Sequence, residues 1–345
     1  MSSSAEYLNP SEAARRLGVS AKALRLYEQR GLVAPVRTAA GWRAYGPDEM
    51  ARAGEIAALR ALGLSLAQVA RVLTGEARGL EPALAAHQAR LESQIRQLAG
   101  AIEKVRDIRA DLVQGKAPAA ADLARLVGPA VELSVAFDLP WPWGGERFEL
   151  REIRALNYII GPLGCGKTRL ALKLSETLPS AAFVGLDRLA DDGAAARARL
   201  AADAKLRARV EQVAAWLVDD GAQTSGALVA LLAALEAEGP AVLVVDMVEQ
   251  GLDEATQEAL IAWLRRRGPT ARPLFLMTRS CSILDLAAVG PDEAILYCPA
   301  NHRPPTRVAP YPGAPGYETV ATCLASPEVR ARTEGVIAMR PPQVA

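Results

Sequence analysis

Residues 161–168 are G-P-L-G-C-G-K-T, a complete G-x-x-x-x-G-K-T phosphate-binding loop. An apolar run at 156–160 precedes it and a helical pattern at 168–178 follows, which is the strand, loop and helix context that this motif requires. The glycines let backbone N–H groups turn toward phosphate oxygens, and the helix N-terminus adds about half a positive elementary charge. Lys167 would reach the β- and γ-phosphates, and the Thr168 hydroxyl would hold Mg²⁺. The candidate nucleotide-binding residues of the loop are Gly161, Gly164, Cys165, Gly166, Lys167, Thr168 and Arg169.

The composition indicates a globular protein of roughly two or three domains. The chain has 345 residues, of which 50% are apolar and 23% are charged. No run of about 18 apolar residues predicts a membrane span, and the N-terminus lacks the apolar centre of a secretion signal. We therefore expect a cytoplasmic protein with no membrane partner. Four scattered cysteines without C-x-x-C spacing, and only two histidines, weigh against a disulfide framework and a histidine-rich metal site.

Residues 1–75 carry a surplus of positive charge, with ten Lys and Arg against six Asp and Glu. Two short helical patterns flank a Gly-Val-Ser turn, and Ser20 is placed to cap the second of them. Helices joined in this way form a helix-turn-helix, whose second helix suits the major groove of DNA. The predicted elements are helices at 10–17, 21–30, 50–62 and 66–73 and a two-stranded wing within 32–46.

Three segments of this region resemble the MerR family of transcription regulators in order and spacing. They are LRLYEQRGL at 24–32, GWRAY at 41–45 and LRALGLSL at 59–66, and the resemblance covers about residues 7–74. Leu26 departs from it, because the family commonly has an aromatic residue there. The resemblance implies a dimer that binds double-stranded promoter DNA, grips the backbone with each wing, and has RNA polymerase as a further partner at the promoter.

Cations and hydroxyls on the second helix and the wing have the chemistry for phosphate contacts. Two cations lie on the candidate recognition helix, and two more lie with a tyrosine in or beside the wing. Two interpretations fit Tyr27: a position in the core and a contact with DNA. The candidate DNA-binding residues are Ser20, Lys22, Arg25, Tyr27, Arg37, Arg43 and Tyr45.

The segment 80–113 has the apolar spacing of a coiled coil about three heptads long. Its a and d positions are Leu91, Ile95, Leu98, Ile102, Val105 and Leu112. Similar MerR proteins pair such helices antiparallel, which implies a homodimer; the alternative is a helix packed on the second domain of its own chain. We expect a DNA-binding domain at 1–75, a dimerisation helix at 76–116, a linker at 117–129 and a nucleotide-binding domain at 130–345.

An apolar run at 241–245 ends in Asp246, which is the pattern of a buried parallel strand with a carboxylate at its C-terminal end. Such an Asp can hold the Mg²⁺ shell beside the phosphate loop, the Walker B role. The stretch 249–256 resembles the D-loop of ABC-type ATPases, and the closest likeness is to RecF- or SMC-like heads. By the same resemblance, Ser225 and Gly226 form a shortened signature motif and Arg279 stands at the switch position. These segments predict an α/β P-loop domain that binds ATP and Mg²⁺.

Departures from the ABC-type pattern predict weak hydrolysis. Met247 stands where those ATPases have the glutamate that polarises water, and Arg279 replaces their switch histidine. Glu249 is the nearest carboxylate and the candidate catalytic residue, although it aligns with a non-catalytic position. Losing water activation costs about 10²–10⁴ in rate. No guanine-specific motif is present, which favours ATP over GTP.

Ahead of the phosphate loop, predicted strands at 131–135 and 148–150 flank a turn that contains Pro, Trp and Gly. Trp141 and Trp143 in this turn would either stack on adenine or pack in the core of a hairpin. The Pro-rich stretch after residue 298 has no assigned role.

Three functions fit these segments. The first is a transcription regulator whose distortion of promoter DNA is controlled by ATP binding, with slow or absent hydrolysis. The second is an active ATPase or small-molecule kinase fused to its own DNA-binding regulator, with a lid formed by the arginines at 197, 199, 207 and 209. The third is a platform for dimerisation that responds to another ligand.

Overall fold

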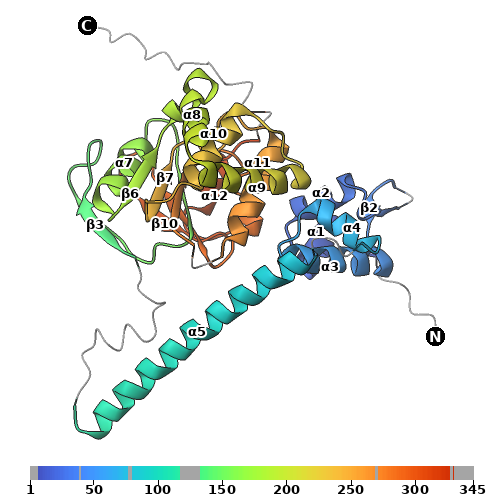
Figure 1. Ribbon diagram of the computed structural model, residues 1–345, viewed down its shortest axis with the longest axis horizontal. Coiled ribbons are helices and arrows are strands. Elements are labelled where there is room, and N and C mark those ends of the chain that lie inside the picture. The colour runs from blue at the N-terminus through green and yellow to red at the C-terminus, as the bar shows by residue number, and fades with distance from the viewer. Residues whose placement is uncertain are drawn as a thin grey trace.

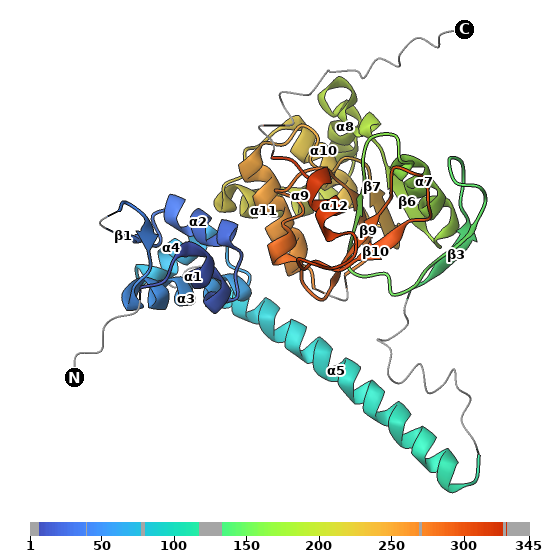
Figure 2. The same cartoon turned by 180° about the vertical axis from the view of Figure 1, so that it is seen from behind.

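The computed structural model describes residues 7–38, 40–76, 80–116, 133–268, 271–326 and 329. It consists of a small helical N-terminal domain, a long helix that leaves it, and a larger α/β C-terminal domain (Figure 1). The C-terminal domain lies beside the N-terminal domain, whereas the far end of the long helix projects away from both (Figure 2). The predicted linker at 117–129 lies outside the described residues.

Capping residues define the helices of the N-terminal domain. Asn9 and Glu12 form a capping box at the start of the first helix, and Gly18 ends that helix with a φ of 67°. The Ser20 hydroxyl accepts the amide of Ala23 and begins the second helix. The elements are α1 (Pro10–Leu17), α2 (Ala21–Gln29), β1 (Val36–Arg37), β2 (Arg43–Ala44), α3 (Pro47–Ala61) and α4 (Leu66–Leu73). Because β1 and β2 pair antiparallel, the predicted wing is confirmed.

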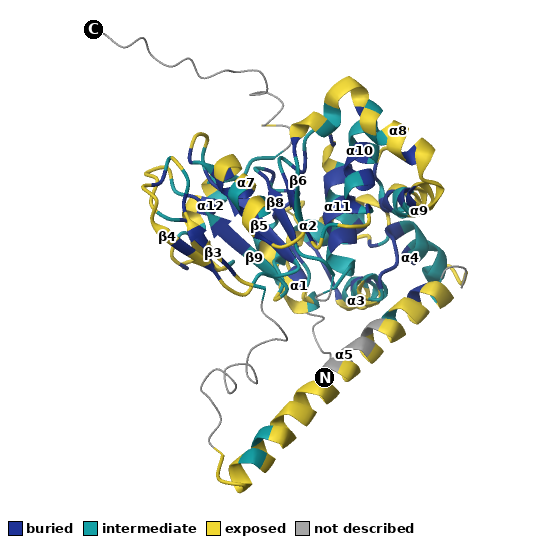
Figure 3. Ribbon diagram, turned by 60° about the vertical axis from the view of Figure 1, so that its left-hand side comes forward, coloured by how far each residue is buried: buried dark blue, intermediate teal, exposed yellow. Residues whose placement is uncertain are grey.

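One apolar cluster holds the N-terminal domain together. Leu24 of α2, Tyr45 beside the wing and Ile56 of α3 are buried in it. The long helix α5 (Leu80–Val113) joins this cluster through Ala83 and then leaves it. Farther along, α5 is exposed on nearly all sides, as the yellow colour in Figure 3 shows. In the described part of the chain, no helix has the length and apolarity needed to span a bilayer.

A six-stranded sheet forms the centre of the C-terminal domain, in the order β10-β9-β5-β8-β7-β6. Its strands are parallel except β10, which pairs antiparallel at one edge. The strands are β5 (Leu156–Ile160), β6 (Ala181–Val184), β7 (Val242–Val245), β8 (Leu274–Met277), β9 (Glu293–Tyr297) and β10 (Thr306–Val308). The helices are α7 (Lys167–Thr177), α8 (Ala194–Ala202), α9 (Ala204–Asp220), α10 (Gly226–Leu235), α11 (Glu254–Arg266) and α12 (Tyr317–Cys323).

Alternate residues of the central strands point to opposite faces of the sheet. Phe275 and Met277 of β8 join one apolar cluster, whereas Leu274 and Leu276 join the other. The first face is covered by α7 and by an antiparallel hairpin of β3 (Val135–Asp138) and β4 (Arg147–Leu150). The second face is covered by α9, α10 and α11. Layers on both faces leave the C-terminal ends of the parallel strands as one edge, where the phosphate loop lies.

The structure confirms the expected fold class, a helical winged helix-turn-helix region followed by an α/β domain. Three elements, at 10–17, 66–73 and 156–160, have the predicted bounds. After the D-loop-like stretch, α11 begins at Glu254, because the Asp253 side chain caps it through the amide of Thr256.

Candidate nucleotide site and DNA-reading surface

The phosphate loop joins the end of β5 to the first turn of α7, and its path depends on its glycines. A Cβ on Gly161 would collide with the carbonyl oxygen of Cys298, and one on Gly166 would lie 2.6 Å from Cη2 of Trp143. Gly164 and Gly166 have φ values of 79° and 98°, which glycine adopts without strain. The loop therefore has the tight backbone path of a phosphate cradle, with the free first-turn amides of a helix at its mouth.

Lys167 is folded back onto the loop. Its Nζ donates to the carbonyl oxygens of Gly161 and Pro162, both at 2.7 Å, and the side chain is 9% exposed. A polyphosphate would replace these neutral acceptors with charged ones, which bind an ammonium group more strongly. Thr168 is exposed beside it, where its hydroxyl is open to a metal ion. The residues present thus fit the phosphates of a nucleotide and its Mg²⁺.

Cys165 is an acidic thiol beside this lysine, with Sγ 3.6 Å from the Lys167 ammonium. A hydrogen bond with Cys298 and the charge of Lys167 lower the pKa of Cys165 from 9.0 to about 6, although burial opposes the shift. The same hydrogen bond raises the pKa of Cys298 well above its usual range. The two shifts have opposite directions because the Cys298 thiol stabilises a thiolate on Cys165.

Asp246 follows β7, at the same edge of the sheet as the phosphate loop. Since β8 lies between β5 and β7, the two motifs follow alternate strands. Burial raises the pKa of Asp246, and the nearby positive charges of Arg188 and Lys167 oppose that rise. A cation beside this carboxylate is therefore favourable, as the Walker B role requires.

Arg188 is a residue of this edge that the sequence reasoning missed. Its guanidinium donates to the carbonyl oxygens of Asp246 and Met247, at 2.8 and 2.7 Å, and also to that of Gly185. Burial lowers the pKa of Arg188, and the carboxylates of Asp246 and Glu249 oppose this. No local signal in the sequence marked Arg188, because it comes soon after β6, a strand that the sequence analysis did not predict.

Glu249 connects the segments that follow β7 and β8. Its Oε1 accepts the backbone amide of Arg279 at 2.9 Å, and its side chain is buried. Met247, at the position of the missing glutamate, has a φ of 43°, which is uncommon for a residue with a side chain. The structure thus gives Glu249 a positioning contact, and its catalytic role stays a prediction.

The remaining nucleotide candidates have local contacts. Ser225 caps α10 through the amide of Leu228, at 3.1 Å. Gly226 lies so close to Asp192 that a Cβ there would collide with its carboxylate. Ser225 therefore contacts its own helix, whereas Gly226 lies against the segment before α8.

The two tryptophans of the β3–β4 turn have different environments. Trp143 is buried and donates its Nε1 hydrogen to the carbonyl of Arg303 at 3.0 Å, so it belongs to the core. Trp141 is 74% exposed, and the guanidinium carbon of Arg169 lies 5.8 Å from its ring centre. Trp141 thus remains open at the mouth of the loop.

Three of the four arginines proposed as a lid form ion pairs on or beside α8 and α9. The pairs are Arg197 with Asp192, Arg207 with Glu211 and Arg209 with Glu238. These contacts are typical of solvated helix faces.

On the N-terminal domain, cations of α2 and the wing line a groove of about 880 Å³. Arg43 in this groove is paired with Glu28 at 2.8 Å, and Arg37 in the wing donates to the carbonyl of Gly41 at 2.9 Å. We call this groove the DNA-reading surface; its cations are Lys22, Arg25 and Arg43.

Two of the candidate DNA-binding residues are buried, and for Tyr27 this favours the core position over the DNA contact. Tyr27 is 4% exposed and Tyr45 is fully buried, with its hydroxyl hydrogen-bonded to Glu28. In this structure neither phenol reaches the surface where a phosphate would bind. Ser20 is also nearly buried, because its hydroxyl serves as the cap of α2.

Comparison with known proteins identifies the N-terminal part. A protein-family model described as MerR HTH family regulatory protein matches residues 8–76 of this chain. A probable heavy metal-dependent transcriptional regulator of Haemophilus influenzae is 37% identical over 105 residues, which cover 28% of this chain and 82% of that protein. The chain belongs to the MerR family. The HTH-type transcriptional regulator HmrR of Sinorhizobium medicae is 42% identical over 67 residues, which cover 19% of this MerR-family chain and 46% of HmrR.

Solved structures overlap the two halves of this MerR-family protein separately. HiNmlR, a MerR family regulator lacking the sensor domain and bound to promoter DNA, covers 36% of the chain and 98% of its own, with 20% identity and a TM-score of 0.24. An SMC head domain from Thermotoga maritima covers 48% of the chain and 94% of its own, with 13% identity and a TM-score of 0.34. The match to a putative metal-chelate type ABC transporter covers 52% of this chain and 83% of the transporter chain, with 15% identity and a TM-score of 0.36.

Proposed function

We propose that this protein is a homodimeric transcription regulator whose distortion of promoter DNA is controlled by ATP bound in its C-terminal domain. One observation carries the proposal. A MerR winged helix is joined, in one chain, to a phosphate loop whose Lys167 faces the same sheet edge as Asp246. Lys167 would hold the β- and γ-phosphates, and Thr168 and Asp246 would hold Mg²⁺, which neutralises the phosphates. Such a regulator acts in the cytoplasm, with RNA polymerase as its partner at the promoter.

The exposed face of α5 supports the homodimer. Its apolar side chains are 40–65% exposed in a single chain: Leu91, Ile95, Leu98, Ile102, Val105 and Leu112. These six side chains form an apolar seam with the a and d spacing of a coiled coil. A second copy of the helix would cover this seam.

Nucleotide binding supplies enough free energy for such control. Bending or untwisting a promoter costs on the order of a few kcal/mol. A nucleotide that binds one conformation about 100-fold more tightly supplies about 2.7 kcal/mol. Since a methionine cannot activate water, slow hydrolysis would keep the bound state for long periods.

Two measurements test the proposal. Titration calorimetry should show that ATP with Mg²⁺ binds the full chain and that Lys167→Ala loses most of this affinity. A duplex selected from a random library by the wild-type protein should then show an ATP-dependent change in affinity and in transcription, which Lys167→Ala lacks. Identical behaviour with and without ATP would refute the nucleotide control.

A further inference from the structure

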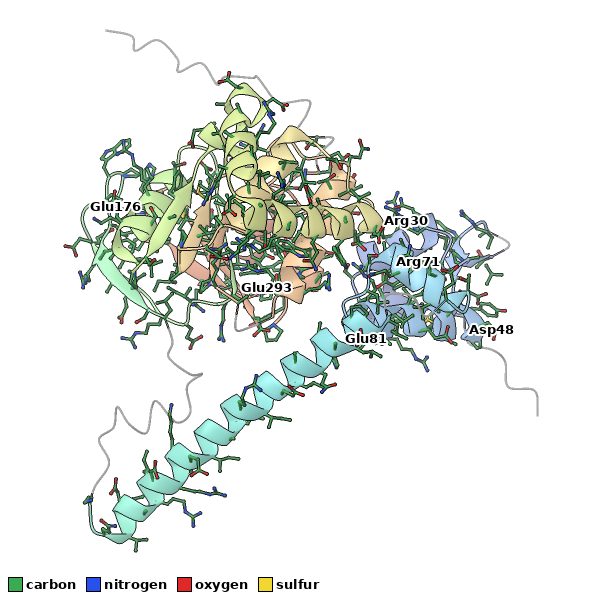
Figure 4. All side chains as sticks on the ribbon, viewed as in Figure 1. Arg30, Asp48, Arg71, Glu81, Glu176 and Glu293 are labelled. Atoms are coloured by element: carbon green, nitrogen blue, oxygen red, sulfur yellow. The ribbon has the colours of Figure 1, made fainter. Side chains whose placement is uncertain are left out.

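Buried contacts hold the C-terminal domain against the N-terminal domain. Asp220, the last residue of α9, accepts hydrogen bonds from Arg60 at 2.5 and 3.1 Å and from the amide of Leu66 at 2.8 Å. Its side chain is 1% exposed, so the carboxylate is enclosed by the partner domain. Three further contacts lie at this end of α9. The indole of Trp216 donates to the carbonyl of Gly63, and Arg30 donates to the carbonyl of Asp220. Arg71 forms an ion pair with Asp219; Arg30 and Arg71 are labelled in Figure 4.

The same packing brings α11 against the recognition helix α2. The Nζ of Lys22 lies 2.8 Å from the carboxylate of Glu258, 3.7 Å from that of Glu254 and 2.9 Å from the hydroxyl of Ser282. The first turn of a recognition helix normally contacts base edges, and Lys22 is in that turn. Glu254 also forms part of the wall of the DNA-reading surface. A lysine held in this way cannot bind DNA, and the carboxylates beside it repel phosphates.

Hydrogen bonds continue from Lys22 into the loops beside the nucleotide site. The amide of Ser282 donates to the hydroxyl of Ser280 at 3.1 Å, which donates to the side chain of Gln257 at 2.6 Å. Gln257 in turn donates to the carbonyl of Leu252 at 2.7 Å. Because Leu252 belongs to the turn after β7 and Ser280 to the segment after β8, movement of either loop would shift the groups that hold Lys22.

We propose that the acidic edge of α11, formed by Glu254 and Glu258, occupies the DNA-reading surface of its own chain and masks Lys22. DNA binding then requires α11 to separate from α2. ATP favours separation by moving the loops after β7 and β8, a link that rests on the proposed function. The masking itself does not depend on that function.

Removal of the two masking charges tests the proposal. The full chain without nucleotide is titrated onto a fluorescent random-sequence duplex of about 30 base pairs at low salt, where phosphate contacts dominate binding. Glu254→Gln with Glu258→Gln should bind about fivefold more tightly than wild type. The control, Glu211→Gln with Glu238→Gln, removes the same charge at exposed positions away from α2 and should change affinity less than about twofold. Unchanged binding by the first variant, or an equal gain in the control, overturns the masking.

An uncharged change at the same interface gives a second test. Trp216 lies between Arg266 and Arg60, whose guanidinium carbons are 4.5 and 5.6 Å from the centre of its ring. Trp216→Ala should therefore weaken the contact between the two domains. If masking is correct, this variant should also bind DNA more tightly than wild type. If both interface variants bind more tightly but ATP has no effect on wild type, masking holds and nucleotide control fails. If ATP alters DNA binding while neither variant does, the proposed function holds and masking fails.

Discussion

Asp220 and Arg60 form a bidentate ion pair across the boundary between the domains, with oxygen–nitrogen distances of 2.5 and 3.1 Å. Asp220→Asn should weaken the docking of the domains by about 3 kcal/mol, because Arg60 is left largely buried without a counter-charge. The Leu66 amide, which donates to the same carboxylate, reports this directly. Its hydrogen exchange should accelerate by about 100-fold.

Asp219 provides the matched control for this change. It lies 3.6 Å from Arg71, and both side chains are 41% exposed. Asp219→Asn should therefore cost less than about 1 kcal/mol and leave exchange at Leu66 nearly unchanged. Equal exchange rates in the two variants would contradict a special role for the buried pair.

Cys165 should make stability depend on pH. Its pKa is lowered to about 6 from an ordinary value of 9.0, so the folded state favours the thiolate. This stabilisation is fully present above pH 9 and is lost as the pH falls through about 6. Melting temperatures measured between these limits should rise with pH more steeply in wild type than in Cys165→Ala. Parallel curves for the two proteins would show that the thiolate does not stabilise the fold.

Local signals in the sequence predicted much of the fold. The capping residue Ser20 and the uninterrupted apolar run at 156–160 fix their elements without reference to the rest of the chain. β6 was missed because Ala181–Val184 is short and has no alternation of polar and apolar residues.

The contacts that organise the candidate site could not be predicted in this way. Arg188 meets Asp246 across 58 residues of sequence, and Arg60 meets Asp220 across 160. Each of these arginines has the appearance of a surface charge in the sequence, and only tertiary packing encloses it. The burial of Tyr45 follows likewise from the closure of the wing over Glu28.

Met247 should limit ATP hydrolysis. Met247→Glu places a carboxylate after Asp246, where it would act as a base for the attacking water, and should raise multiple-turnover phosphate release by about 100-fold. Met247→Gln is the control, since its amide cannot accept the proton and should leave the rate near that of wild type. If wild type already turns over faster than about 1 s⁻¹, the expectation of slow hydrolysis is wrong.

The apolar seam of α5 should determine the oligomeric state. Leu98 and Ile102 are 65% and 52% exposed in the single chain, so pairing of two helices would remove both from water. Leu98→Ser with Ile102→Ser should convert the dimer to a monomer in light scattering, because each truncated side chain loses about 1.5–3 kcal/mol of burial. Glu103→Ser with Arg106→Ser removes an exposed ion pair from the same turns and should leave the dimer intact. If the seam variant remains a dimer, the dimer interface lies elsewhere. That other interface would then set the spacing of the two recognition helices on DNA.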